Sequence, residues 1–227
     1  MSTVRAAHAR LTGFSWVQLS LLVGGLLTLG WSAWQTQGID ARIVRDGLMF
    51  LVIPVALARA YGRELGFRVD RRAILHALVL AAVVLPFYIV GSSLPTIRAY
   101  YPMWGLSSTA PAAFIPHAAK QVLIVIAAET YYRGLLCVGV RELGPKSIFI
   151  SPVVYAIAHA AKPPIEILLS GPTDVLFGAA DYRSRSLLPS IVAHGLGLVL
   201  LDWLVLHPPL LSPSRVLGWL AWLPVPL

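Results

Sequence analysis

Long apolar runs separated by short polar segments dominate the pattern of this 227-residue chain. A helix needs about 20 mostly apolar residues to cross the hydrocarbon core of a bilayer. Runs close to that length, and two shorter ones, predict helices at 14–34, 48–61, 73–90, 114–140, 148–160, 165–180 and 187–206. We therefore expect an all-α fold, a polytopic transmembrane bundle of about seven helices. With no long soluble linker, residues 1–227 are expected to form a single integral membrane domain.

The composition supports a membrane protein over a soluble one. Hydrophobic residues make up 57% of the chain and charged residues only 12%, with a mean hydropathy of +0.75. Soluble domains carry roughly 25% charged residues. The first apolar run is longer than the hydrophobic part of a signal peptide, and no small-x-small cleavage site follows it, so we expect a retained anchor helix.

The net charge of +8 is distributed as a membrane topology rather than as a nucleic-acid interface. With the N-terminus in the cytoplasm, eleven basic residues fall on the inner side and five on the outer side, which follows the positive-inside rule. The inner set is Arg5, Arg10, Arg59, Arg63, Arg68, Arg71, Arg72, Arg141, Lys146, Arg183 and Arg185, and the outer set is Arg42, Arg45, Arg98, Lys162 and Arg215. We expect the lipid bilayer, and no nucleic acid, as a partner.

A charged pair interrupts the apolar run at 114–140. Glu129 and Arg133 are four residues apart, so on a helix they share a face and can form an ion pair. Each charge at membrane depth costs roughly 2.5–3.5 kcal/mol on insertion scales, so such residues usually have a function. Two interpretations remain open at this point: a buried ion pair that joins this helix to its neighbours, and a carboxylate kept ionised for chemistry.

Two histidines lie in later apolar runs. His159 follows Tyr155 by one helical turn and could be an ordinary hydrogen-bonded residue or a catalyst. His194 is followed by Gly195 and Gly197, which would let a backbone or a substrate approach closely. A carboxylate and two imidazoles suit water activation and stabilisation of a tetrahedral intermediate. Glu129, His159 and His194 could instead hold zinc, but no compact zinc motif is present, and we expect no cofactor.

The segment AAETYYRGLLCVGVRELGPKSIFISPVVYAIAHA resembles the core of the CPBP family of intramembrane proteases, which includes the CAAX prenyl endopeptidases and the bacterial Abi proteins. The family's first motif, Glu-Glu-x-x-x-Arg, is matched by Glu129, Arg133 and the following Gly134. Tyr155 and His159 match the second motif, Phe-x-x-x-His. The stretch VLFGAADYRSRSLLPSIVAHG resembles the third block, whose histidine is His194. The resemblance covers residues 114–200, the expected catalytic core.

Two positions depart from the family pattern. Ala128 stands where the family's first glutamate, usually assigned to water activation, is expected, and Leu198 stands where an asparagine usually helps to hold the oxyanion. Neighbouring helical positions point about 100° apart, so Glu129 cannot occupy the missing side chain's place without a rotation of the helix. Another carboxylate could substitute, and the candidates are Glu166, Asp174 and Asp202.

The resemblance implies a glutamic-type intramembrane endopeptidase in the inner (cytoplasmic) membrane of a bacterium. Glu129, alone or with His159, would activate water, Arg133 would orient the carboxylate, and His194 would polarise the scissile carbonyl or stabilise the oxyanion. The substrate would be a membrane-anchored peptide or protein entering between helices.

Two other functions fit the same residues. Ala128 and Leu198 are compatible with a non-catalytic relative, a membrane binding or immunity protein. A proton-coupled transporter could use Glu129, His159 and His194 as a relay, but the chain lacks the internal symmetry and paired broken helices typical of such folds.

Overall fold

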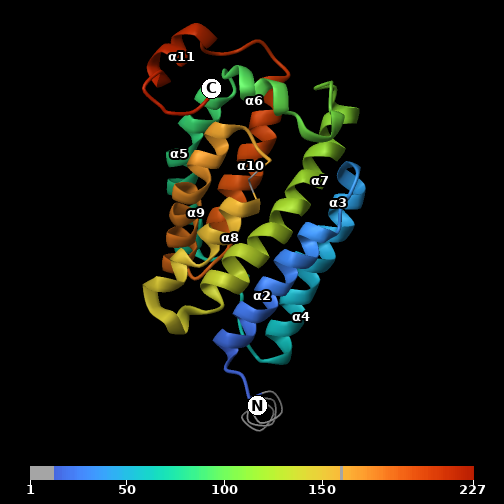
Figure 1. The fold of residues 1–227 in the computed structure, drawn as a ribbon, viewed down its shortest axis with the longest axis vertical. Coiled ribbons are helices and arrows are strands. Elements are labelled where there is room, and N and C mark those ends of the chain that lie inside the picture. The colour runs from blue at the N-terminus through green and yellow to red at the C-terminus, as the bar shows by residue number, and fades with distance from the viewer. Residues whose placement is uncertain (1–12, 159–160) are drawn as a thin grey trace.

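The computed structural model describes residues 13–158 and 161–227, with backbone alone for 156–158. The secondary structure of this described part is helical, with no strand. Its long helices run side by side along one axis and form an elongated bundle (Figure 1). The described chain begins at the lower end of the bundle in that view and ends at the upper end, where the C-terminus lies.

Four helical segments are long and apolar enough to cross a membrane. They are α2 (Trp16–Ala33), α5 (Arg71–Gly91), the continuous segment Pro111–Val138, and α10 (Leu188–Val205). They overlap the predicted helices at 14–34, 73–90, 114–140 and 187–206. Large apolar side chains face outward from them, among them Leu29, Leu78 and Ile115, each more than 60% exposed. Such a surface is suited to lipid rather than water, so the protein is an integral membrane protein.

The predicted helix at 48–61 is part of a longer helical run that begins ten residues earlier. This run comprises α3 (Gly38–Asp46), the π-helical segment η1 (Gly47–Val52) and α4 (Ile53–Ala60). Its polar first part is helical because Asp46 is buried among partners: Arg45 and Arg42 form ion pairs with it at 2.9 and 2.6 Å, and the indole of Trp31 donates to it at 2.8 Å.

The remaining two predicted helices differ in extent from the structure. Within the described residues, the helix at 148–160 is reduced to α8 (Ser151–Ala158). The helix at 165–180 becomes α9 (Pro164–Ser184), which continues for a further turn. Glu166, Asp174 and Asp181 make α9 less apolar than the four candidate spans.

The segment Pro111–Val138 changes its helical type at Glu129. It comprises α7 (Pro111–Glu129) and the π-helical segment η3 (Thr130–Val138), all of whose residues are buried. The Gly139 amide donates to the Gly134 carbonyl at 2.7 Å, an i to i+5 bond. A Cβ atom at Gly139 would lie 2.7 Å from that carbonyl, so the wide turn requires glycine here. Wide turns of this kind are frequent at functional sites.

Helix α2 holds η3 in place from one side. The Tyr131 hydroxyl donates to the Gly24 carbonyl at 2.8 Å, and the Trp16 indole donates to the Gly139 carbonyl at 2.8 Å. The ring of Phe50 stacks on Tyr131 with centroids 4.4 Å apart. These contacts fix the position of the charged residues at the junction of α7 and η3.

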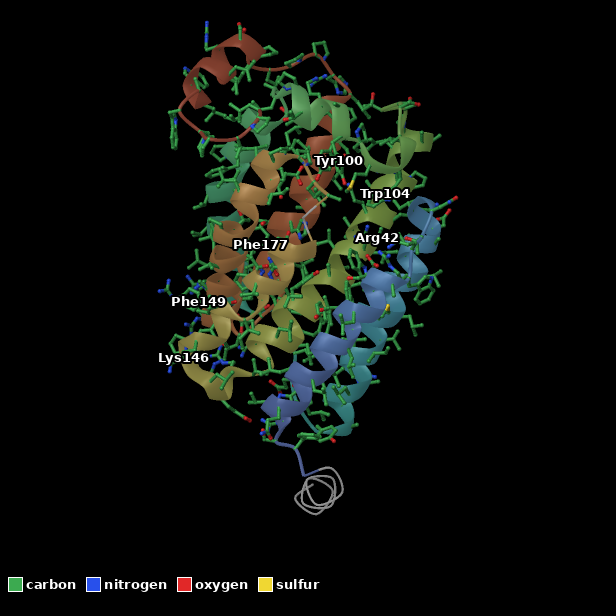
Figure 2. The ribbon with its side chains drawn as sticks, viewed as in Figure 1. Arg42, Tyr100, Trp104, Lys146, Phe149 and Phe177 are labelled. Atoms are coloured by element: carbon green, nitrogen blue, oxygen red, sulfur yellow. The ribbon has the colours of Figure 1, made fainter. Side chains whose placement is uncertain are left out.

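Short segments pack over both ends of the bundle. At the upper end in Figure 1, α6 (Pro95–Tyr100) and α11 (Pro213–Leu220) pack on the apolar cluster that includes Ile97 and Val216, and the 3-10 turn η2 (Met103–Gly105) lies between α6 and α7. At the lower end, η4 (Arg141–Phe149) carries Lys146 and Phe149 at the edge of the molecule, while Phe177 lies inside it (Figure 2).

Candidate active site

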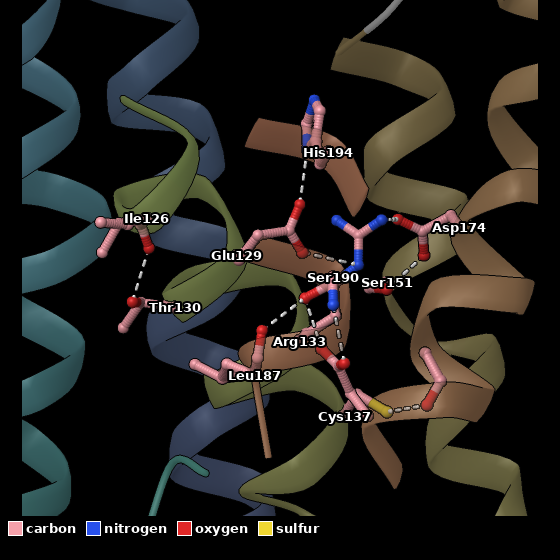
Figure 3. A network of polar contacts seen from close by, with 12 residues as sticks. Ile126, Glu129, Thr130, Arg133, Cys137, Ser151, Asp174, Leu187, Ser190 and His194 are labelled. Atoms are coloured by element: carbon pink, nitrogen blue, oxygen red, sulfur yellow. Dashed lines mark hydrogen bonds and ion pairs between the residues drawn. The ribbon is translucent and has the colours of Figure 1, made fainter. Parts of the chain in front are cut away.

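Glu129, at the last position of α7, lies between two partners from different elements (Figure 3). Its Oε1 atom is 2.6 Å from Nδ1 of His194 on α10, and its Oε2 atom is 3.1 Å from Nε of Arg133 on η3. The ion pair that the i, i+4 spacing predicts is therefore confirmed. The carboxylate has no exposed surface, so both of its oxygens are directed at protein groups.

Arg133 also joins the site to α9. Its Nη2 atom is 2.6 Å from Oδ1 of Asp174, whose other oxygen accepts a hydrogen bond from the Ser151 hydroxyl of α8. Arg133, Glu129 and Asp174 all have zero exposed side-chain surface. Two carboxylates thus share one guanidinium, and a proton on the His194 ring would make the group electrically neutral.

Three aromatic rings surround the Arg133 guanidinium. Its Cζ atom lies 4.7 Å from the ring centroid of Tyr155, 5.4 Å from that of Phe177 and 5.7 Å from that of Tyr132. Contacts of this kind attract a cation to the face of the ring. Tyr132, which directly precedes Arg133, and Tyr155 of the second motif therefore both pack around the arginine.

His194 is the member of this group that faces open space. Its side chain is 16% exposed, and it lines a cavity of about 310 Å³ between α5, α9 and α10. Figure 3 shows the ring held at one nitrogen by Glu129, with the second nitrogen directed away from the carboxylate. A carboxylate that accepts from Nδ1–H leaves Nε2 as the atom able to accept or donate a proton in the cavity.

Tyr88 of α5 lines the same cavity beside His194. A Cβ atom built on Gly197 would lie 2.2 Å from the Tyr88 ring and 2.5 Å from its hydroxyl oxygen. Glycine at 197 therefore permits the ring to lie against the α10 backbone, one turn beyond His194. In the described part of the chain, the Tyr88 hydroxyl makes no hydrogen bond. Among those residues the hydroxyl has no acceptor, and Tyr88 lines the cavity.

The two departures from the family motifs have different surroundings. Ala128 packs against the apolar cluster that contains Phe50, Tyr131 and Tyr155. Leu198 lines the cavity, where its side chain offers no hydrogen-bond donor. Of the site residues predicted from the sequence, His159 lies outside the described residues, while Glu129, Arg133 and His194 come together.

The three substitute carboxylates that the sequence suggested lie in three different places. Asp174 joins the network through Arg133, at 2.6 Å. Glu166 lines the far end of the cavity. Asp202 is bound instead to His117 and Gln121, at 3.1 and 3.0 Å, in a separate buried group. Glu129 is thus the carboxylate in contact with His194.

Sequence reasoning missed a second buried carboxylate that supports the site. Asp181 of α9 accepts bonds from the Ser190 amide at 3.1 Å and the Ser190 hydroxyl at 2.5 Å, which ties the end of α9 to the start of α10. Ser190 precedes His194 by one turn, so this contact sets the position of the histidine. An acidic residue directly after the apolar run at 165–180 is the sequence feature that could have indicated it.

The zinc set that the sequence allowed includes His159 and cannot be assembled from the described residues. Over 13–158 and 161–227, no group of three His, Cys, Asp or Glu side chains converges as a metal site. The single cysteine, Cys137, is buried and contacts the Gly178 carbonyl at 3.7 Å.

Comparison with known proteins identifies the region that contains this site. Residues 110–199 match the family model described as type II CAAX prenyl endopeptidase Rce1-like. No curated protein and no solved structure matches the chain. The matched region includes Glu129, Arg133 and His194 and overlaps residues 114–200, where the three sequence motifs lie. The similarity to the Rce1-like (CPBP) family of CAAX prenyl endopeptidases thus covers residues 110–199.

Proposed function

We propose that the protein is an intramembrane endopeptidase that hydrolyses a peptide bond of a membrane-anchored peptide or protein, with His194 as the general base. The match of residues 110–199 to the Rce1-like family model supports a peptidase at the level of the family. The observation that carries the residue roles is the 2.6 Å contact between Glu129 Oε1 and His194 Nδ1. It leaves the other ring nitrogen facing a cavity.

His194, rather than Glu129, is the better candidate to touch water. The Glu129 side chain is fully buried and does not line the cavity, whereas His194 does. His194 Nε2 takes a proton from water as the oxygen attacks the scissile carbonyl carbon. The resulting imidazolium is stabilised by Glu129. Collapse of the tetrahedral intermediate breaks the C–N bond, and His194 returns the proton to the leaving amine.

Tyr88 supplies the donor that Leu198 lacks. As the carbonyl oxygen becomes negative, the free Tyr88 hydroxyl donates to it from the α5 side of the cavity. Removal of one such donor typically lowers kcat by about 10²–10³-fold. Arg133 is then a positioning residue: it holds Glu129, which holds the imidazole.

The substrate reaches this cavity from the bilayer. Phe87 of α5 and Leu176 of α9 line the cavity and are also 59% and 40% exposed on the surface of the bundle. The cavity therefore extends to the lipid-facing surface between α5 and α9. The excess of basic residues on one side supports an orientation with the N-terminus in the cytoplasm of a bacterial inner membrane.

The test compares cells that produce the wild type with cells that produce His194→Ala, Glu129→Gln, Tyr88→Phe or His159→Ala. New C-termini among membrane proteins are identified by mass spectrometry. Products from the wild type that are lost in His194→Ala and Glu129→Gln support the proposal, and Tyr88→Phe should form them at least tenfold more slowly. His76→Ala, an exposed histidine on α5, is the matched control and should cleave normally.

One observation favours a non-catalytic alternative. Ala128 is packed against aromatic side chains where the family's first glutamate is expected. A binding protein that had lost cleavage would give no products from the wild type, and Ala128→Glu alone would produce them. Products from the wild type that persist in both His194→Ala and Glu129→Gln would contradict the proposed roles.

A further inference from the structure

A second group of polar side chains lies at the other end of the cavity from His194. Tyr101, Lys162 and Glu166 all line it. Lys162 Nζ donates to the Tyr101 hydroxyl at 2.7 Å, and this hydroxyl donates to Glu166 Oε2 at 3.0 Å. Lys162 and Glu166 also form an ion pair at 3.3 Å, with side chains 18% and 21% exposed.

This group has one hydrogen-bond acceptor and one hydrogen-bond donor that are not used within the group. Oε1 of Glu166 is buried and has no hydrogen-bond partner within the described chain. Among the described residues, the ammonium of Lys162 has two partners, Tyr101 and Glu166, for its three hydrogens. Burial lowers the pKa of Lys162, and the charge of Glu166 opposes that shift. The pair therefore has one unused acceptor, Glu166 Oε1, and one unused N–H donor on Lys162. The negative charge of Glu166 and the positive charge of Lys162 cancel.

The distance between the His194 end and the Glu166 end of the cavity determines how many residues of an extended peptide would lie between them. Phe177, whose ring centroid is 6.1 Å from that of His194, is eleven residues from Glu166 on α9. At 1.5 Å per residue this is about 16 Å along the helix. An extended peptide rises about 3.3 Å per residue, so roughly five residues would cover the distance. The walls between the ends are apolar, with Leu169, Leu198 and Leu201 among them.

We infer that Tyr101, Lys162 and Glu166 bind one peptide group of an extended, apolar substrate segment, about five residues from the bond that is hydrolysed. The substrate carbonyl accepts from Lys162, and the substrate N–H donates to Glu166 Oε1. This inference rests on the proposed function because it names the substrate of that same site.

The charges of the group favour a peptide unit over other ligands. A free carboxylate there would leave one negative charge uncompensated beside Glu166, at a partly buried position where unpaired charge is costly. A lipid chain would leave the free Glu166 oxygen without a donor. A peptide unit is neutral and offers both a donor and an acceptor. We therefore expect the substrate chain to continue past this point rather than end at it.

The experiment measures binding apart from cleavage. The probe is a fluorescently labelled twelve-residue Leu/Ala peptide with an acetylated N-terminus and a C-terminal carboxamide, bound to the detergent-solubilised full chain with His194→Ala to prevent hydrolysis. Each amide is replaced in turn by an ester, which removes one N–H. We expect one ester position to weaken binding about tenfold, equivalent to ~1.4 kcal/mol.

That loss should depend on the polar group at the outer end. In Lys162→Met with Glu166→Leu, which replaces the ion pair by apolar side chains, the parent peptide should bind more weakly and the ester effect should disappear. Lys120→Met is the matched control: it removes a lysine paired with Asp40 at 2.6 Å, away from the cavity, and should retain the ester effect.

Any of four results would overturn the inference. They are no sensitive ester position, the same sensitivity in the double variant, tighter binding of a probe that ends in a free carboxylate at this point, and competition by a fatty acid but not by the peptide. If the ester effect is found while cells show no cleavage, the substrate assignment stands and the proposed catalysis fails. The reverse pattern would leave catalysis intact and remove the subsite.

Discussion

Arg133→Met should be among the most destabilising single substitutions in this protein. Arg133 lies 3.1 Å from Glu129 and 2.6 Å from Asp174, and all three side chains have no exposed surface. Removing one member of a buried ion pair typically costs 3–5 kcal/mol because the partner stays buried without compensation. Here two carboxylates lose their counter-charge, so we expect about 4 kcal/mol or more, measured by thermal or SDS-induced unfolding in detergent.

The cause of this loss can be separated from the loss of packing. In Arg133→Met with Glu129→Gln and Asp174→Asn, no unpaired charge remains, and the stability should recover by at least half. Arg63→Met is the control, because Arg63 pairs with Glu142 at the surface and exposed pairs contribute about 0–1 kcal/mol. If Arg133→Met costs no more than this control, or the triple variant is the least stable of all, the buried charges do not hold the site together.

Three further outcomes follow from other contacts. Gly197→Ala should lower the free energy of unfolding by about 1–3 kcal/mol and reduce cleavage, because the added Cβ would lie 2.2 Å from the Tyr88 ring. The control is Gly171→Ala, whose added Cβ would have no neighbour within 4 Å. It should leave the free energy of unfolding unchanged. The Ala73 amide, which donates to Asp70 at 2.8 Å, and Arg68 lower the pKa of Asp70. The ionised Asp70 cap therefore contributes its full stability above the unfolded-state pKa of the carboxyl. This contribution is lost as the pH falls through the lower folded-state pKa. In Asp70→Asn the free energy of unfolding should therefore depend less on pH in the acid range. Ser190→Ala should lower the rate of cleavage with little change in KM, because it removes the hydroxyl bond to Asp181 that helps to position His194. An unchanged rate would show that the α9–α10 contact is structural alone.

The apolar runs of the sequence predict most accurately the helices that expose apolar side chains on the outer surface of the bundle. Where a run is uninterrupted, as in α5 and α10, the predicted and observed bounds agree within a few residues. The helix at 48–61 was predicted too short because its first half is polar and resembles a loop. Its stability depends on Asp46 being buried against Trp31, Arg42 and Arg45, a tertiary contact that local periodicity does not record.

The same distinction applies to the charged residues. The Glu129–Arg133 ion pair was predicted because both residues belong to one helix, where spacing determines which side chains meet. The contact of Arg133 with Asp174 joins two helices 41 residues apart in sequence, so no local rule indicates it. Asp174 was considered only as a replacement for the missing glutamate. The free hydroxyl of Tyr88 is likewise a product of packing, since it depends on Gly197 in another helix.

The helical register explains why one remaining glutamate could still serve a hydrolase. A two-glutamate motif places its carboxylates about 100° apart, so one can bind the arginine while the other faces the reaction. Here position 128 is alanine, and Glu129 is directed at Arg133 and His194. A buried carboxylate cannot bind the water that attacks, but it can orient an imidazole that does. In the proposed mechanism the proton transfer therefore passes through His194. For that reason Glu129→Gln should remove the cleavage products without abolishing substrate binding, whereas Ala128→Glu would introduce a second base rather than repair the first.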